Sequence, residues 1–167
     1  MVNKTMLRTL RAVVPIDKRI VIVNIGTNIE VFDSVAPLVG SMLQDADTDY
    51  EIYGDMDKPI TALNVKEWIT LINEEHKDDF IIGIDACISK SREIGETYLR
   101  LDPIKPGSGV GKVLPPVGEV GILGVVARNR QDVRFCSQAK VVKIANDIVD
   151  TLLELDKIRK EERREII

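Results

Sequence analysis

The chain has 167 residues, of which 44% are hydrophobic and 30% charged, and a net charge of −4, so one domain spanning 1–167 with one core is expected. The acidic balance argues against nucleic acid as a main partner, and no apolar run approaches the ~20 residues of a membrane span. Two cysteines form no disulfide framework and the first residues lack a signal-peptide core, so a cytoplasmic location is expected.

Apolar runs alternate with segments of helical periodicity along the chain. The first run, at 19–26, is continuous and closes on glycine, which is typical of a central buried strand. Apolar residues then recur at helical spacing from Val35 to Ala46, and either Asp33 or Ser34 is placed to cap that helix. Further strands are expected at 49–54, 79–86, 94–102 and 119–127, and further helices at 60–76 and 137–167.

This alternation predicts an α/β sandwich around a largely parallel sheet. The strand at 94–102 follows the strand at 79–86 too closely for a helical crossover, so the sheet is expected to be mixed. The last residues, 157–167, lose the apolar periodicity and mix charges of both signs. We expect them to form a charged helical tail that is solvated or mediates self-association.

Two aspartates follow or end buried strands, Asp33 after 19–26 and Asp85 at the end of 79–86. In open α/β sheets the functional site lies beyond the carboxyl ends of the strands, so both side chains are expected at one edge. Two neighbouring carboxyl groups push their pKa values apart, and such a pair can activate a water molecule. The structural alternatives are a helix cap for Asp33 and a turn cap for Asp85.

The glycine-rich stretch PIKPGSGVGKVLPP, at 103–116, resembles a phosphate-binding loop only superficially. It fits neither the Walker nor the dinucleotide spacing, and a proline pair follows it where a helix would have to begin. We interpret it as a rigid loop whose backbone amides are available to a ligand. The candidate binding residues are Gly107, Ser108, Gly109 and Gly111.

Histidine chemistry has little support in this chain. His76 is the single histidine, and its place at a helix end predicts a surface residue. A Ser-His-Asp or Cys-His site therefore has no base, and a zinc site lacks its usual ligands.

Four segments occur in order over most of 19–127, namely IVNIGTNIEVFDSVAPLVGSML, IYGDMDKPITALNV, FIIGIDACISKS and IKPGSGVGKVLPPVGEVGILGVV. In these segments the chain resembles the YyaC family of sporulation proteins. That family in turn resembles the spore germination protease, which cleaves small acid-soluble spore proteins, and more distantly the hydrogenase maturation endopeptidases. The resemblance implies a three-layer α/β fold with a mixed, largely parallel central sheet.

The resemblance also implies an atypical aspartic peptidase that uses two aspartates. The helix-opening Asp-x-x-x-Pro of the germination protease matches Asp33 with Pro37, and its strand-ending Asp-Ala matches Asp85 with Ala86. The histidine of the nickel site in the maturation endopeptidases has no counterpart, so neither a metal nor another cofactor is expected.

One departure from the family keeps a second hypothesis open. Residues 26–34 read GTNIEVFDS, where the family typically has Gly-Thr-Asp-Arg-Ser-Thr-Gly-Asp-Ser, so a polar wall has become partly apolar. The chain is therefore either a peptidase or a non-catalytic protein of the same fold that binds a peptide or protein. The expected setting is the cytoplasm of a sporulating bacterium, and the expected partners are a peptide or spore protein and a second copy of the chain, without nucleic acid or membrane.

Overall fold

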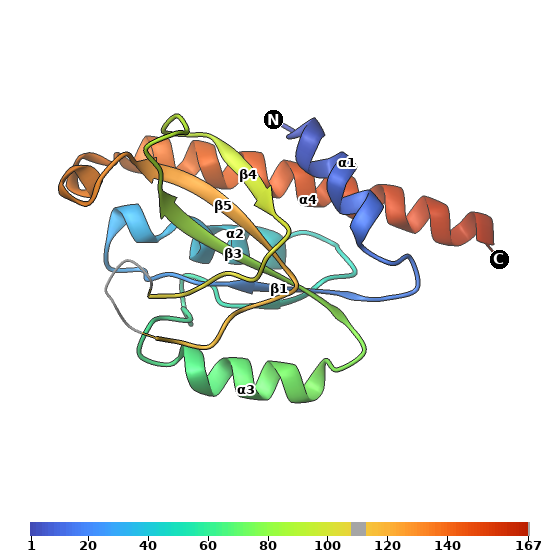
Figure 1. Ribbon diagram of the computed structural model, residues 1–167. Helices are drawn as coiled ribbons and strands as arrows, with labels where there is room; N and C mark the ends of the chain where they lie inside the picture. Colours follow the sequence, from blue (N-terminus) through green and yellow to red (C-terminus); the bar gives the residue numbers. More distant parts are fainter. Residues whose placement is uncertain (108–112, 167) are drawn as a thin grey trace.

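A five-stranded sheet with the order β2-β1-β3-β5-β4 forms the centre of the protein in the computed structural model, which describes residues 1–107 and 113–166 (Figure 1). Its first four strands in this order are parallel, and β4 runs antiparallel to β5. The mixed, largely parallel sheet predicted from the sequence is therefore confirmed. The strands are β1 (Ile20–Asn24), β2 (Glu51–Tyr53), β3 (Phe80–Ile88), β4 (Thr97–Arg100) and β5 (Val120–Ala127).

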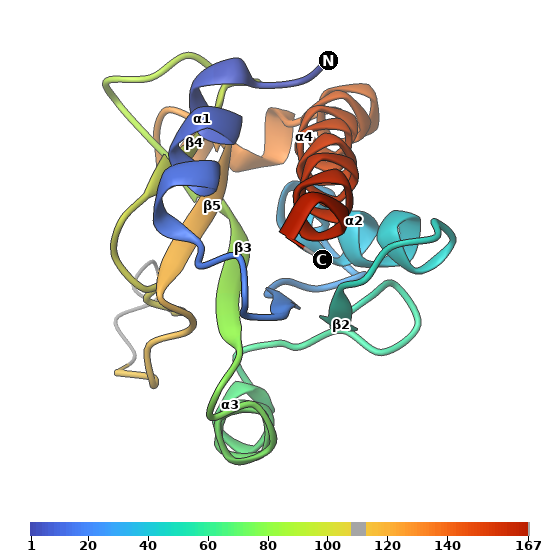
Figure 2. The same ribbon diagram turned by 90° about the vertical axis from the view of Figure 1, so that its right-hand side faces the viewer.

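Helices cover both faces of the sheet and give three layers. Helix α3 (Val65–Glu75) lies alone on one face, whereas α1 (Lys4–Val13), α2 (Val35–Gln44) and α4 (Gln138–Ile166) lie on the other (Figures 1 and 2). The alternation of side chains along each strand feeds two cores. In β1, Ile22 packs with the α2 and α4 side and Val23 with the α3 side.

Two short 3-10 helices lie at the carboxyl edge of the parallel strands, η1 (Val31–Asp33) before α2 and η3 (Arg130–Phe135) after β5. Within the residues that the structure describes, no helix combines the length and the apolar composition needed to cross a membrane.

Helix α1 is an element that the sequence analysis did not assign. It buries Met6 and Leu10, which are one helical turn apart, against the α4 side of the sheet. The side chain of Asn3 caps it by accepting a hydrogen bond of 3.1 Å from the Met6 amide. The same side chain donates to the carbonyl of Thr97 in β4 at 2.9 Å, so the cap also ties the helix to the sheet.

The charged end of α4 is not a solvated tail, so that part of the expectation for 157–167 is wrong. Arg159 is only 5% exposed, and its guanidinium donates to the carbonyls of Pro15 and Lys18 at 3.2 and 2.6 Å. Arg163 donates to the Ile16 carbonyl at 3.2 Å. These arginines satisfy carbonyls of the loop that leads into β1, and this long-range contact leaves no periodic signal in the sequence.

Replacing Arg159 with alanine is expected to lower the free energy of unfolding by about 1–3 kcal/mol, because buried carbonyls lose charged donors. Arg164→Ala is the matched control, since Arg164 is exposed between one and two turns further along α4 and should change stability by less than ~0.5 kcal/mol. Urea unfolding of both variants measures the difference. Equal stability of the two variants would restore the interpretation of this segment as a solvated tail.

Candidate active site

Asp33 lies in η1, where the chain turns from β1 into α2. The Thr27 amide donates to the Asp33 carbonyl at 2.9 Å, which folds the loop back on itself. A Cβ atom on Gly26 would lie 2.3 Å from that carbonyl oxygen, so only glycine allows this close approach. The fold of residues 26–33 therefore fixes Asp33 at the carboxyl edge of the sheet.

The helix-cap alternative for Asp33 is wrong. Ser34 occupies the N-cap position of α2, and neither it nor Asp33 makes a side-chain capping bond in the described structure. The Ser34 hydroxyl instead donates to the Val31 carbonyl at 2.7 Å. The Asp33 carboxyl is thus not committed to holding the helix.

Asp85 lies inside β3 rather than at its end. The strand continues to Ile88, and Asp85 is in register with Leu123 of β5. The predicted turn after Asp85 is therefore absent from this described segment, and the turn-cap alternative is wrong. Alternate side chains of β3 that share a face with Asp85, such as Ile81 and Cys87, pack in the core on the α3 side. Asp85 is partly buried beside them.

The Asp33 carboxyl lies close enough to that of Asp85 for its charge to affect the pKa of Asp85. Burial raises the pKa of Asp85 well above its usual value, and the neighbouring Asp33 carboxyl raises it further. Burial, followed by repulsion from Glu30, raises the pKa of Asp33 from 3.8 to about 6. Among the described residues, neither group is in an ion pair, and the one opposing contribution to the Asp85 pKa is a hydrogen bond from the Ala86 backbone amide, which lowers it. Burial and the neighbouring Asp33 carboxyl therefore favour the protonated form of Asp85.

The described base of the glycine loop lies on the same face of β3 as Asp85. Ile104 and Val117 close the loop through two backbone hydrogen bonds of 2.9 Å each. Ile104 packs against Gly83, which is two residues before Asp85, so the loop base is roughly 7 Å from the aspartate along the strand. Gly107 has a φ of +70° that favours glycine, whereas the other three candidates, Ser108, Gly109 and Gly111, lie outside the described residues.

His76 is a buried residue, so the prediction of a surface histidine is wrong. It is 6% exposed, its Nε2 lies 2.7 Å from the Tyr53 hydroxyl and its Nδ1 lies 2.8 Å from the Asp79 carboxylate. These partners hold it just before the amino end of β3, at the opposite edge of the sheet from Asp33. It supplies no base for the aspartate pair.

The same placement decides whether a resident metal fits. A carboxylate-aspartate-histidine site would need a third donor beside Asp33 and Asp85, but His76 is held at the other edge. Within residues 1–107 and 113–166, no three histidine, cysteine, aspartate or glutamate side chains gather as a metal site. The described donors therefore do not fit such a metal, and we derive no chemistry from one.

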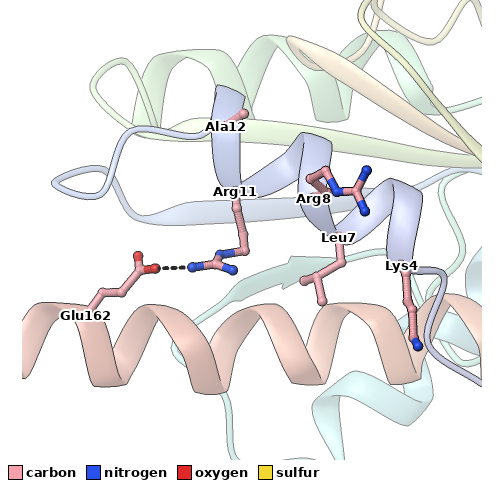
Figure 3. A pocket seen from close by; sticks show the side chains of 6 residues that line it. All are labelled: Lys4, Leu7, Arg8, Arg11, Ala12 and Glu162. Atoms are coloured by element: carbon pink, nitrogen blue, oxygen red, sulfur yellow. Dashed lines mark hydrogen bonds and ion pairs between the residues drawn. The ribbon is translucent and has the colours of Figure 1, made fainter.

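A hollow of about 470 Å³ lies between α1 and α4 (Figure 3). Arg11 and Glu162 form an ion pair of 2.8 Å in its wall. None of its lining residues comes from the segments that carry Asp33 or Asp85, so the hollow is not part of the candidate active site. The lining residues are Lys4, Leu7, Arg8, Arg11, Ala12 and Glu162.

Tyr98 and Arg92 are further residues near Asp85 that the sequence analysis did not single out. Tyr98 lies in β4, and the sheet register aligns it with Asp85 through Leu123. The Arg92 guanidinium lies 3.6 Å from the centre of the Tyr98 ring. The alternation of β4 could have placed Tyr98 on one face, but only the antiparallel pairing with β5 decides which face that is.

Comparisons with known proteins agree with this architecture. The fold is similar to the [NiFe] hydrogenase maturation protease HycI from Thermococcus kodakarensis KOD1, with a TM-score of 0.55 and 19% identity over 84% of this chain and 93% of that one. A peptidyl-tRNA hydrolase matches with a TM-score of 0.50 and 10% identity over 84% of this chain and 87% of that one. At such identities the similarity shows the fold alone, because one fold can support different activities.

A curated relative is closer in sequence. The "Uncharacterized protein YyaC" of Bacillus subtilis (strain 168) is 41% identical over 110 residues, which cover 65% of this chain. The match spans 54% of that relative, so the chain corresponds to about half of its length. Residues 1–151 match the family described as "Protein of unknown function (DUF1256)". The chain therefore belongs to the DUF1256 family.

Proposed function

We propose that this protein is a peptidase in which Asp33 and Asp85 share a proton and activate water, and that it acts on a spore protein in a sporulating bacterium. The observation that carries the proposal is the pair of partly buried carboxyl groups at one sheet edge, without a counter-ion among the described residues. Burying an unpaired carboxyl pair costs free energy, and a purely structural role would provide no stabilising contact to offset that cost. The peptidase-like fold and the YyaC relative support the proposal.

The two pKa directions support one division of roles between the aspartates. Asp85 has the more strongly raised pKa and holds the shared proton, whereas Asp33, with a pKa of about 6, is ionised at neutral pH. Asp33 accepts a proton from water as the water oxygen attacks the peptide carbonyl carbon, and Asp85 donates its proton to the carbonyl oxygen. The tetrahedral intermediate then breaks its C–N bond, with Asp33 returning the proton to the leaving amine and Asp85 recovering its own from the hydroxyl.

A non-catalytic peptide-binding role is the second candidate, and a specific observation favours it. Ile29 and Val31, in the loop that leads to Asp33, are 82% and 44% exposed. Exposed apolar side chains next to the aspartates favour contact with a partner. Both candidates place a peptide at the same edge, and they differ in whether the peptide bond is broken.

Incubation with proteins extracted from Bacillus subtilis spores, followed by mass spectrometry of new termini, separates the two candidates. Cleavage is expected with the unaltered protein and is expected to fall by at least ~100-fold in Asp85→Asn and in Asp33→Asn. The double variant should be little worse than either single one, because the two groups act together. Asp78→Asn, which alters an exposed aspartate, should cleave normally. New termini that persist in both single variants, or binding of spore proteins without any new termini, would contradict the peptidase.

The stability of Asp33→Asn should depend on pH in a characteristic way. The pKa of Asp33 rises from 3.8 to about 6 on folding, so the carboxyl contributes its full stability below pH ~4 and loses it as pH rises through 6. Asparagine does not ionise, so the variant is expected to be about 1–3 kcal/mol more stable than the unaltered protein at pH 7.5 and equal to it at pH 4.

Urea unfolding at the two pH values measures this difference. Asp78→Asn should show no comparable gain at pH 7.5, because its side chain is exposed and in no ion pair of the described residues. A loss of stability in Asp33→Asn at pH 7.5 would show that the carboxyl is a structural group after all.

A further inference from the structure

The face of the sheet that carries Asp85 continues across two more strands to a tyrosine. Asp85 of β3 is in register with Leu123 of β5, which is in register with Tyr98 of β4. Side chains in register across a sheet point to the same face, so Asp85 and Tyr98 lie on one face with Leu123 buried between them. Two strand spacings separate them by roughly 10 Å.

The partly exposed side chain of Cys87 lies between Asp85 and this tyrosine. Cys87 is two residues beyond Asp85 on the same face of β3, and its Sγ lies 3.6 Å from the Tyr98 hydroxyl. Burial raises the pKa of the Cys87 thiol and its contact with Tyr98 lowers it, while smaller contributions from Asp85 raise it and from Arg92 and Arg100 lower it. Asp85, Tyr98, Arg92 and Arg100 therefore all lie close to Cys87.

Two arginines form the far side of this patch. The Arg92 guanidinium stacks on the Tyr98 ring with its central carbon 3.6 Å from the ring centre, which orients the planar donor group. Arg100 follows Tyr98 by two residues in β4 and extends from the same face. The patch thus combines cations at one end with Asp85 at the other, in a chain whose net charge is −4.

The carboxylates that accompany these arginines are weakly held. Arg92 contacts Glu96 at 3.4 Å and Arg100 contacts Asp102 at 3.5 Å. All four side chains are at least two-fifths exposed, and exposed ion pairs of this kind contribute little to stability. A carboxylate supplied by a ligand can replace them and form a two-pronged contact with a guanidinium.

We propose that Arg92 and Arg100 form a subsite that binds a carboxylate of the peptide, either an acidic side chain or the chain terminus. This inference rests on the proposed function, because it takes the aspartate pair as the place where the peptide is cut. An extended chain advances about 3.3 Å per residue, so the roughly 10 Å between the strand positions of Asp85 and Tyr98, on whose ring Arg92 stacks, places the carboxylate about three residues from the cleaved bond. The substrate class is thereby a peptide with an acidic group close to the cleavage site.

Three libraries of synthetic decapeptides with random sequence test the subsite. One has both ends blocked and contains aspartate and glutamate, the second contains neither but has a free terminal carboxylate, and the third has no carboxylate at all. Each is incubated with the unaltered protein to detect cleavage, and with immobilised Asp85→Asn protein to detect retention, by mass spectrometry. We expect the first or second library to exceed the third at least ~10-fold in both measurements, and the library that does so identifies the source of the carboxylate.

Variants show whether the arginines cause the preference. Arg92→Gln and Arg100→Gln, each made in the unaltered and the Asp85→Asn protein, should reduce retention and cleavage of the preferred library about 10-fold. The loss should appear in KM rather than kcat, because the contact serves binding. Lys90→Gln is the matched control, since it removes an exposed cation two residues from Arg92 that does not stack on Tyr98. Arg92→Lys keeps the charge but not the planar stack and should be intermediate. Thermal melting checks that each variant is folded.

The outcomes separate this subsite from the proposed function. Retention that depends on a carboxylate and on Arg92, but without cleavage, supports the subsite and contradicts the peptidase. Cleavage without any preference among the three libraries overturns the subsite and leaves the peptidase standing. An unchanged preference in both arginine-to-glutamine variants, or neither retention nor cleavage of any library, also overturns the subsite.

Discussion

The site depends on an electrostatic repulsion that the described structure does not relieve. Two carboxyl groups are held together at the carboxyl edge of the sheet, partly out of water, and the described residues provide no cation to pair with either. Burial raises the pKa of each carboxyl group, and the Asp33 charge raises the pKa of Asp85 further. Retaining a proton relieves this arrangement, and an acid beside a base is what the proposed peptidase would need at this edge.

The fold supplies the rigidity that such a pair requires. Asp85 lies within a hydrogen-bonded strand between β1 and β5, and Asp33 is fixed by the close approach of its carbonyl to Gly26. Neither aspartate is used to cap a helix or a turn. Rigid placement of reacting groups on a packed scaffold is what efficient proton transfer needs, because small errors in position are costly. Helices on both faces of the sheet hold this edge in place.

Local signals in the sequence were sufficient for most of the sheet and for the location of the aspartates. Continuous apolar runs marked β1, β3 and β5, and the short connection before β4 predicted its antiparallel direction. Other features depend on contacts between distant parts of the chain and could not be predicted in this way. Asn3 holds α1 against β4, Arg159 binds carbonyls about 140 residues earlier, and Tyr53 and Asp79 bury His76. The position of Asp85 inside β3 likewise depends on the pairing of β3 with β5, and this pairing continues to Ile88 of β3.

The most direct measurement of the central claim is an NMR titration of the carboxyl carbons of Asp33 and Asp85, assigned with the two asparagine variants. The account predicts that the two groups titrate separately, Asp33 near pH 6 and Asp85 well above the ordinary value of 3.8, and that removing Asp33 lowers the pKa of Asp85. Titration of both carboxyl groups together near the ordinary value of ~4, unaffected by each other's replacement, would contradict it.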